Sequence, residues 1–360
     1  MKTKSNMNST EKRAALTLSS VFALRMLGLF MLLPVFALVG QNLTGFTPAL
    51  IGFAIGAYGL TQAIFQIPFG WMSDRFGRKP IILFGLVLFA IGSLVAAFSD
   101  HIYGVIAGRL LQGCGAIASA IMALAADLSR DEQRTKIMAS IGMSIGAAFA
   151  LAMILGPSLT ELVGLNGLFM VIAALALIAM LVIYFLTPNP DAQFVQRDAI
   201  ATRGEFSRIF NDRQLMRLNF GIFTLHFLLT SFFVAFPNRL AGLGVQLADH
   251  SWIYLLTMVA AVVLMLPMII IAEKNRQHAR VMLLGVLLIA AVQFSFGMFS
   301  FPLTLVVVAM VIYFTGFNLM EALLPSMISR IAPLSGKGTA LGVYSTSQFA
   351  GAFLGGPVAG

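Results

Sequence analysis

Four ionisable side chains stand inside long apolar segments of this 360-residue chain, where a charge is costly and indicates a function. They are Arg25, Arg109, His226 and Glu321. Glu321 is the only carboxylate deep inside such a segment, so it is the first candidate for a group that exchanges protons. Arg25 is its candidate partner, because both lie roughly 10 Å from the same end of their predicted helices by helix rise. Arg109 and His226 are further candidates for proton coupling.

Each candidate also has a purely structural interpretation. Glu321 and Arg25 could form a permanent ion pair, His226 could be a hydrogen-bonded interior histidine, and Arg109 could extend toward the outer end of its helix. Further polar residues in the apolar segments could line a cavity, although each alone is more often a contact between helices. These cavity candidates are Gln62, Gln66, Asn318, Tyr344 and Gln348.

The segments that must position these residues are long enough to cross a bilayer. A crossing helix needs about 20 apolar residues, and eleven such segments are predicted: 17–39, 49–71, 81–98, 102–126, 137–158, 166–187, 215–237, 251–272, 279–298, 303–328 and 338–360. Hydrophobic residues make up 59% of the chain and charged residues 10%, against about 25% charged residues in soluble domains. The chain is therefore expected to be an all-α polytopic membrane protein.

The basic residues predict how the segments are oriented. Of the 23 Lys and Arg residues, most lie in the N-terminal tail and in the even-numbered connections, whereas the odd-numbered connections hold only Arg239. Because cytoplasmic loops carry the excess of Lys and Arg, the N-terminus and the even connections are expected to be cytoplasmic. The net charge of +9 is spread over these short connections, which argues against nucleic acid as a partner.

Two patterns repeat at an offset of 199 or 200 residues and predict a duplicated unit. Pro68, Asp74 and Arg75 correspond to Pro267, Glu273 and Lys274, and Gly142 with Gly156-Pro157 corresponds to Gly342 with Gly356-Pro357. We expect an N-terminal half over 1–187, a cytoplasmic linker over 188–214 and a C-terminal half over 215–360. By this repeat, a twelfth span is expected at about 366–387, which makes this chain a fragment of a longer protein.

The stretch from Gly70 to Pro80, Gly-Trp-Met-Ser-Asp-Arg-Phe-Gly-Arg-Lys-Pro, resembles the signature loop of the major facilitator superfamily. Arg109-Leu-Leu-Gln-Gly-Cys-Gly-Ala116 is similar to that superfamily's fourth-helix motif, and Arg25-Met-Leu-Gly28, Gln62, Gln66 and Asn318–Ala322 are similar to its drug–proton antiporters. The resemblance implies the major facilitator fold, with two six-helix halves and eleven of twelve transmembrane helices present. It implies a conformational-switch motif formed by Gly70, Asp74, Arg75, Gly77, Arg78, Lys79 and Asp127.

A carboxylate at the C-terminal end of a helix, such as Asp74, is poorly placed unless it faces a cation or another helix's N-terminus. The resemblance implies that Asp74 faces the start of the eleventh span in one conformation only. Arg78 is then free to pair with Asp127 at the end of the fourth span. The resemblance also implies that the four spans with ionisable residues line a central cavity and that Arg109 takes part in proton coupling.

These observations predict a secondary transporter of the bacterial inner membrane that exports small amphipathic molecules in exchange for protons by alternating access. The fifth span has Ala152 where the antiporters have a glycine, so a proton-coupled importer of a sugar or nucleoside remains the alternative, with a membrane receptor behind it. The sequence contains no nucleotide-binding loop or metal-ligand motif. An enzyme, a cofactor and a metal are therefore not expected, and the partners are a small molecule, protons and lipid around a monomer.

Overall fold

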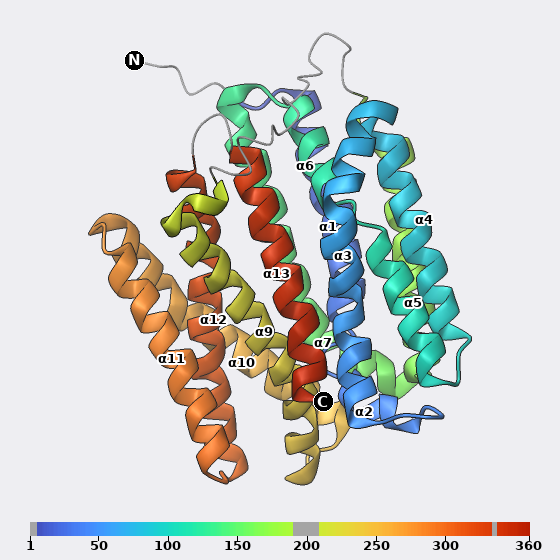
Figure 1. The fold of residues 1–360 in the computed structure, drawn as a ribbon, viewed down its shortest axis with the longest axis vertical. Helices are drawn as coiled ribbons and strands as arrows, with labels where there is room; N and C mark the ends of the chain where they lie inside the picture. The colour runs from blue at the N-terminus through green and yellow to red at the C-terminus, as the bar shows by residue number, and fades with distance from the viewer. Residues whose placement is uncertain (1–5, 190–208, 333–336) are drawn as a thin grey trace.

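The computed structural model describes residues 6–189, 209–332 and 337–360, and this part of the chain is a bundle of helices (Figure 1). The first half contains α1 Ser9–Phe30, α2 Phe36–Val39, η1 Gly40–Asn42, α3 Pro48–Phe76, α4 Arg78–Ala97, α5 Ile102–Cys114, α6 Ala118–Asp127, α7 Asp131–Leu181 and η2 Val182–Leu186. The second half contains α9 Arg213–Gly242, α10 Leu247–Lys274, α11 His278–Met298, α12 Leu303–Ile331 and α13 Lys337–Ala359. Most of the predicted linker 188–214 lies outside the described residues.

The all-α membrane fold predicted from the sequence is confirmed. Nine helical stretches of the described residues are long and apolar enough to cross a membrane. One of them, Glu132–Leu186, has 55 residues and is about 80 Å long by helix rise, too long for one crossing of a core about 30 Å thick. It bends at Gly164, whose φ of 70° is not helical, so it contains the predicted fifth and sixth spans.

Two predicted spans differ from the helices that form. The first was expected over 17–39, but α1 begins at Ser9, where Asn8 and Glu11 form a capping box, and it ends at Phe30. Pro34 lies in the turns that follow, and its missing N–H is consistent with an interrupted helix there. The fourth, expected over 102–126, is broken at 115–117 between α5 and α6.

The break in the fourth span follows from close packing at Gly115. A Cβ atom at this residue would lie 2.2 Å from the carbonyl oxygen of Gly85 on α4, so only glycine permits this approach. The carbonyl oxygen of Gly115 accepts a hydrogen bond of 2.8 Å from Arg25. The interior arginine of α1 therefore supports the interruption.

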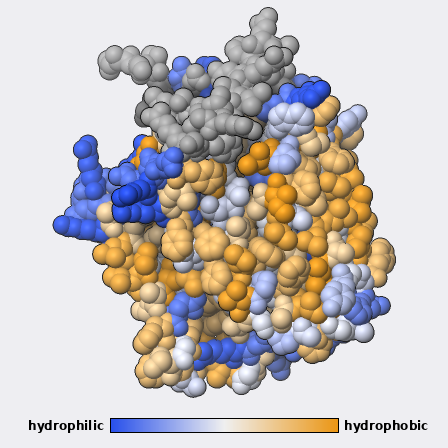
Figure 2. Space-filling view, viewed as in Figure 1, coloured by the Kyte–Doolittle hydropathy of each residue, from blue (hydrophilic) through white to orange (hydrophobic). Residues whose placement is uncertain are grey.

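The bundle has two different ends with an apolar belt between them. Figure 2 shows apolar side chains over the middle of the visible face and hydrophilic ones toward its two ends. We call the end that carries the start of α1 and the connections α3–α4, α6–α7 and α10–α11 the basic end, and the end that carries the connection α2–α3 the opposite end. α13 packs against both α9 and α3, so it bridges the two halves (Figure 1).

Candidate functional site

Glu321, His226 and Gln348 form a polar cluster in the middle of the second half. They come from α12, α9 and α13, so three helices must pack to assemble it. The side-chain nitrogen of Gln348 lies 2.8 Å from Nε2 of His226 and 3.5 Å from Oε1 of Glu321. Nε2 of His226 lies 3.8 Å from Oε2 of Glu321. The Glu321 side chain as a whole is 38% exposed, whereas its Oε2 atom is buried.

The hydrogen bonds define what this cluster can do with a proton. The amide nitrogen of Gln348 is a donor only, so its bond of 2.8 Å fits a His226 whose Nε2 is the acceptor. Oε2 of Glu321 has no hydrogen-bond partner among the described residues. Because Nε2 of His226 already accepts from Gln348, the imidazole is not free to accept a proton from Glu321 in this arrangement, whereas the ionised carboxylate retains Gln348 as a donor.

An aromatic layer lies beside this cluster. The ring of Phe317, one helical turn from Glu321 on α12, lies 6.0 Å from the ring of His226 and 6.2 Å from that of Phe149 on α7. Phe149 also contacts Phe30 of α1 at 5.1 Å and Phe314 at 6.3 Å. The layer is built by both halves, and it separates Glu321 from the opposite end with apolar ring faces.

Arg25 does not pair with Glu321, which corrects the sequence-based expectation. Its Nη2 atom donates to Oε1 of Gln62 and to the carbonyl oxygen of Gly115, each at 2.8 Å. Gln62 also accepts from the hydroxyl of Tyr58 at 3.1 Å and donates to Gln66 at 2.8 Å. Spacing along separate helices cannot reveal on which side a residue points, and here the side chain points into the first half. Gln62 and Gln66 are accordingly buried rather than open to a cavity.

Arg109 belongs to the same buried region of the first half. Its side chain is 1% exposed, so it does not extend to a helix end. Its guanidinium donates to Gln112 at 2.7 Å and to the carbonyl oxygens of Ala54 and Ile55 at 3.3 Å. It lies 5.3 Å from the ring centre of Tyr58, on which Arg25 also stacks at 5.8 Å. Both guanidinium groups thus contact neutral hydrogen-bonding groups and the Tyr58 ring, and Arg25 also lies over the Phe89 ring, while its Nε and Nη1 atoms have no hydrogen-bond partner among the described residues.

Two of the cavity candidates are not part of the Glu321 cluster. Tyr344 is buried on α13, and its hydroxyl has no hydrogen-bond partner among the described residues. Asn318 is half-buried on α12, three residues before Glu321. Gln348 is the cavity candidate that the structure brings to Glu321.

The two halves meet at the opposite end of the bundle. A Cβ atom on Gly52 of α3 would lie 2.1 Å from the carbonyl oxygen of Gly356 on α13, and one on Gly56 would lie 2.4 Å from that of Phe353. The helix backbones therefore touch, as small residues allow. On the other side of the bundle, Ser251 of α10 lies 2.9 Å from Ser158 of α7 and donates to the carbonyl oxygen of Ile154 at 2.8 Å. The opposite end is closed in this conformation.

The expected pairing of Arg78 with Asp127 is present at the basic end. Nε of Arg78 lies 3.0 Å from Oδ2 of Asp127, and the same guanidinium bonds Ser73 and Asp74. Gly77, with φ of 95°, permits the sharp turn between α3 and α4. Asp74 is 40% exposed and bonds Arg78, so in this conformation it has a partner on its own half.

Other members of the predicted switch motif have local contacts. Arg75 stacks on Trp71 at 5.6 Å, and Lys79 donates to the carbonyl oxygen of Thr187 at the end of the sixth span. A Cβ atom on Gly70 would lie 3.3 Å from Oγ of Ser119 on α6. Through Lys79 and Gly70, the motif therefore connects α4 to the end of the sixth span and α3 to α6.

The second half carries a related cluster, which the sequence interpretation recognised only at Glu273. Nη2 of Arg330 lies 2.9 and 3.0 Å from the two carboxylate oxygens of Glu273. His278 lies 3.2 Å from Glu273 and 3.0 Å from Arg330. The offset of 200 that relates Arg78 to His278 could have identified the histidine. The same offset relates Arg130 to Arg330, but Arg130 pairs with Glu11 of α1, so the partner of Arg330 could not be read from the repeat.

Replacing Asp74 with asparagine is expected to shift the balance of conformations without preventing folding. Arg78 keeps Asp127, but the variant loses the negative charge that would face the start of α13 in the other conformation. Such a charge is worth about 0.3–1 kcal/mol at a helix N-terminus, so the population should shift about two- to fivefold toward the conformation described here. Distances between spin labels at the two ends would measure the shift, with Asp100→Asn as control. Unchanged distances with lost folding would contradict a switching role.

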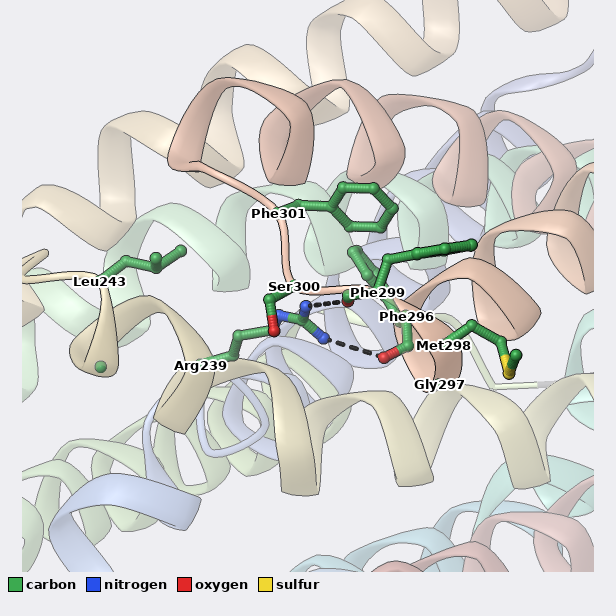
Figure 3. Close-up of a pocket in the computed structure, with 9 residues that line it drawn as sticks. Arg239, Leu243, Phe296, Gly297, Met298, Phe299, Ser300 and Phe301 are labelled. Atoms are coloured by element: carbon green, nitrogen blue, oxygen red, sulfur yellow. Dashed lines mark hydrogen bonds between the residues drawn. The ribbon is translucent and has the colours of Figure 1, made fainter.

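A shallow pocket at the opposite end surrounds Arg239, the single basic residue predicted for the odd-numbered connections (Figure 3). Its guanidinium donates to the carbonyl oxygens of Phe296 and Phe299 at 3.2 and 2.9 Å and stacks on the Phe296 ring at 4.8 Å. These bonds satisfy carbonyl groups at the end of α11. The arginine is therefore engaged in structure, and we do not assign the pocket to the transported molecule.

Comparisons with known proteins agree with the fold and with the sequence motifs. The profile of the Major Facilitator Superfamily matches residues 18–356. The chain is 49% identical over 354 residues to the inner membrane transport protein YajR of Escherichia coli K12, covering 98% of this chain and 78% of that protein. It is 34% identical over 138 residues to a class B tetracycline resistance protein of Escherichia coli, covering 37% of this chain and 33% of that protein.

Among solved structures, a bacterial homologue of the human lysosomal transporter Spinster, in an inward-facing and occupied conformation, has a TM-score of 0.77 at 14% identity. The alignment covers 98% of this chain and 81% of that one. The fold is thus shared with a transporter of very different sequence. The match of the family profile over most of the chain and the 49% identity to a transport protein show that this multi-pass membrane protein is a transporter rather than an enzyme. The chain belongs to the major facilitator superfamily.

Proposed function

We propose that this protein exports small amphipathic molecules in exchange for protons by alternating access. The observation that carries the proposal is the Glu321 cluster. It places an accessible carboxylate next to a histidine and a glutamine, beneath an aromatic layer built by both halves. A carboxylate so placed inside a membrane protein is a candidate for a proton site.

The orientation follows from the charges. With the basic end in the cytoplasm, the closed opposite end faces the outside, and the conformation described here is inward-facing. The relative YajR is described as an inner membrane protein, and we propose the same location for this chain. The units that move against each other would be residues 1–187 and 215–360, acting within one monomer.

In this scheme Glu321 holds a proton or releases it in exchange for the substrate. When the opposite end is open, the carboxylate takes up a proton from outside. When the basic end is open, the proton leaves toward the cytoplasm, and the ionised carboxylate with Gln348 and His226 offers polar contacts to the substrate. Arg25 and Arg109 would contribute indirectly, because they hold the interrupted fourth span and Tyr58 in place.

The proposed substrate class follows from the groups beside Glu321. The rings of Phe149, Phe314 and Phe317 pack against one another and are buried in this conformation. Once the two halves move apart, their faces would suit an apolar body and attract a cationic group by cation–π interaction. The tetracycline resistance protein among the relatives supports export of such a molecule. The closed glycine contact between α3 and α13 supplies the gate that must separate on the outside.

Flux measurements in membrane vesicles with an imposed pH gradient test this function. Export predicts that a labelled amphipathic compound accumulates in inverted vesicles when their lumen is acidic. Vesicles without the protein and vesicles treated with a protonophore are the controls. Accumulation in right-side-out vesicles driven by outside acidity would instead indicate an importer, and saturable binding without flux would indicate a receptor.

A further inference from the structure

A stripe of buried polar groups lies on α10 next to the contact that closes the opposite end. His250, Tyr254 and Thr257 are each 0% exposed. They are spaced at i, i+4 and i+7, so they lie on one face of the helix. Both ring nitrogens of His250, the hydroxyl of Tyr254 and that of Thr257 have no hydrogen-bond partner among the described residues. Buried polar groups are normally hydrogen-bonded, so this stripe is unusual.

The stripe belongs to the gate rather than to the Glu321 cluster. Ser251, the residue after His250, joins α10 to α7 of the other half through Ser158 and Ile154. The ring of Tyr254 lies 6.2 Å from that of His250 and 6.2 Å from that of Phe233 on α9. Separation of the two halves at this end would break the Ser251 contacts and bring water to the groups beside them.

We propose that His250 is a second proton-binding site, located in the outer gate, and that its protonation favours opening to the outside. In the closed gate, a charged imidazole would be cut off from water, and the groups that favour it are the backbone carbonyl of Val245 and the exposed Asp249. The loss of water outweighs these two contributions, which makes the charged form costly. Once the halves separate, water can solvate it. Protons and opening therefore favour each other, because a ligand that binds one conformation better shifts the population toward it. The inference rests on the proposed alternating access, with the opposite end outside.

The charged groups near His250 do not offer an alternative site for the proposed proton. On α10 the neighbouring Asp249 is exposed, and on α7 Glu161 is exposed. On α9 Arg239 is bonded to carbonyl oxygens near the end of α11. The part of α12 before Glu321 and the part of α11 after Arg280 contain no Asp, Glu, Lys, Arg or His. Two histidines therefore lie on these elements: His226 of α9 belongs to the Glu321 cluster, and His250 is the one beside the Ser251 contact, with an ordinary histidine pKa of about 6.5 that allows a change of charge between pH 5 and pH 8.

The size of the effect follows from the same linkage. If only the open gate binds the proton, with a pKa of about 6.5, the open-to-closed ratio should rise about tenfold between pH 7.5 and pH 5.5. Leu162, just before the bend of α7, and Leu243, just after α9, are exposed residues at the opposite end of the bundle. Spin labels at these two positions would report this ratio by distance measurement in lipid nanodiscs. Cys114 is replaced by serine so that only these two sites carry a label.

His250→Gln is expected to remove the pH dependence, and His250→Phe serves as a second variant that keeps an aromatic ring against Tyr254. His101→Gln is the matched control, because His101 lies at the same end but outside the gate. Loss of the tenfold change in either folded His250 variant, with the change retained in His101→Gln, supports the proposal. The change should also persist in Glu321→Gln, which separates it from the proton coupling proposed above. A pH-dependent ratio in both His250 variants, or one that disappears only in Glu321→Gln, would overturn it.

Discussion

Glu321→Gln is expected to reduce transport driven by a pH gradient to the level of vesicles without the protein. Glutamine has nearly the same shape and its amide oxygen can still accept from Gln348, but it cannot exchange a proton. Substrate binding should therefore weaken by less than about tenfold, the effect of losing one hydrogen bond of about 1–1.5 kcal/mol. Gradient-driven flux and equilibrium binding of the same labelled compound, measured in parallel, separate these two effects.

The matched control is Glu161→Gln, which removes an exposed carboxylate just before the bend of α7, at the opposite end of the bundle. It should leave both flux and binding near the values of the unchanged protein. If Glu321→Gln transports against a gradient as well as that control, the proton site must lie elsewhere. If both binding and flux are lost, Glu321 is required for binding the substrate or for folding, and gel filtration in detergent distinguishes these two cases.

Gly52→Val is expected to prevent closure of the opposite end and to abolish net transport. Even a Cβ atom at this position would lie 2.1 Å from the carbonyl oxygen of Gly356 and 2.7 Å from its carbon. Backbone atoms cannot rotate away as a side chain can, so α3 and α13 must separate. We expect flux at background level, an outer end that stays open, and a loss of about 1–3 kcal/mol in the closed state from overpacking. The Leu162–Leu243 spin-label pair measures the opening.

Gly142→Ala is the matched control for this steric argument. Gly142 also lies within a membrane helix, but no atom outside its own helix lies within 4 Å of its added Cβ atom. Alanine there should leave transport unchanged and favour the helix by about 0.5–1 kcal/mol. Closed distances and full flux in Gly52→Val would show that the α3–α13 contact is not the gate.

Much of the architecture is visible in the amino-acid sequence because the bilayer restricts what a chain can do. Apolar segments of about 20 residues must form helices there, so each of the eleven predicted spans is largely helical, although the first and the fourth are interrupted. The stretch from Gly70 to Pro80 and the Arg109 motif identified the superfamily. The pairing of Arg78 with Asp127 was expected from that resemblance and from the opposite charges of the two residues, and the structure contains it.

Helix ends were predicted less well, for local reasons. The start of α1 depends on the capping box of Asn8 and Glu11, which stabilises polar residues in a helix beyond the apolar segment. The interruption after Cys114 depends on the backbone contact between Gly115 and Gly85 and on the hydrogen bond from Arg25. A hydropathy pattern contains neither of these interactions, so it predicted one continuous span.

The partners of the interior charges were decided by the tertiary structure alone. The sequence places four ionisable residues, Arg25, Arg109, His226 and Glu321, inside apolar segments. Because burying a charge in a membrane is energetically costly, these four were identified as functional candidates. It could not tell that Arg25 points into the first half toward Gln62 whereas Glu321 meets His226 and Gln348, because the direction of a side chain depends on how each helix is rotated in the bundle. That rotation is set by packing between helices distant in sequence, such as α13 against α3 and α9, where backbone contact at glycines fixes which faces meet.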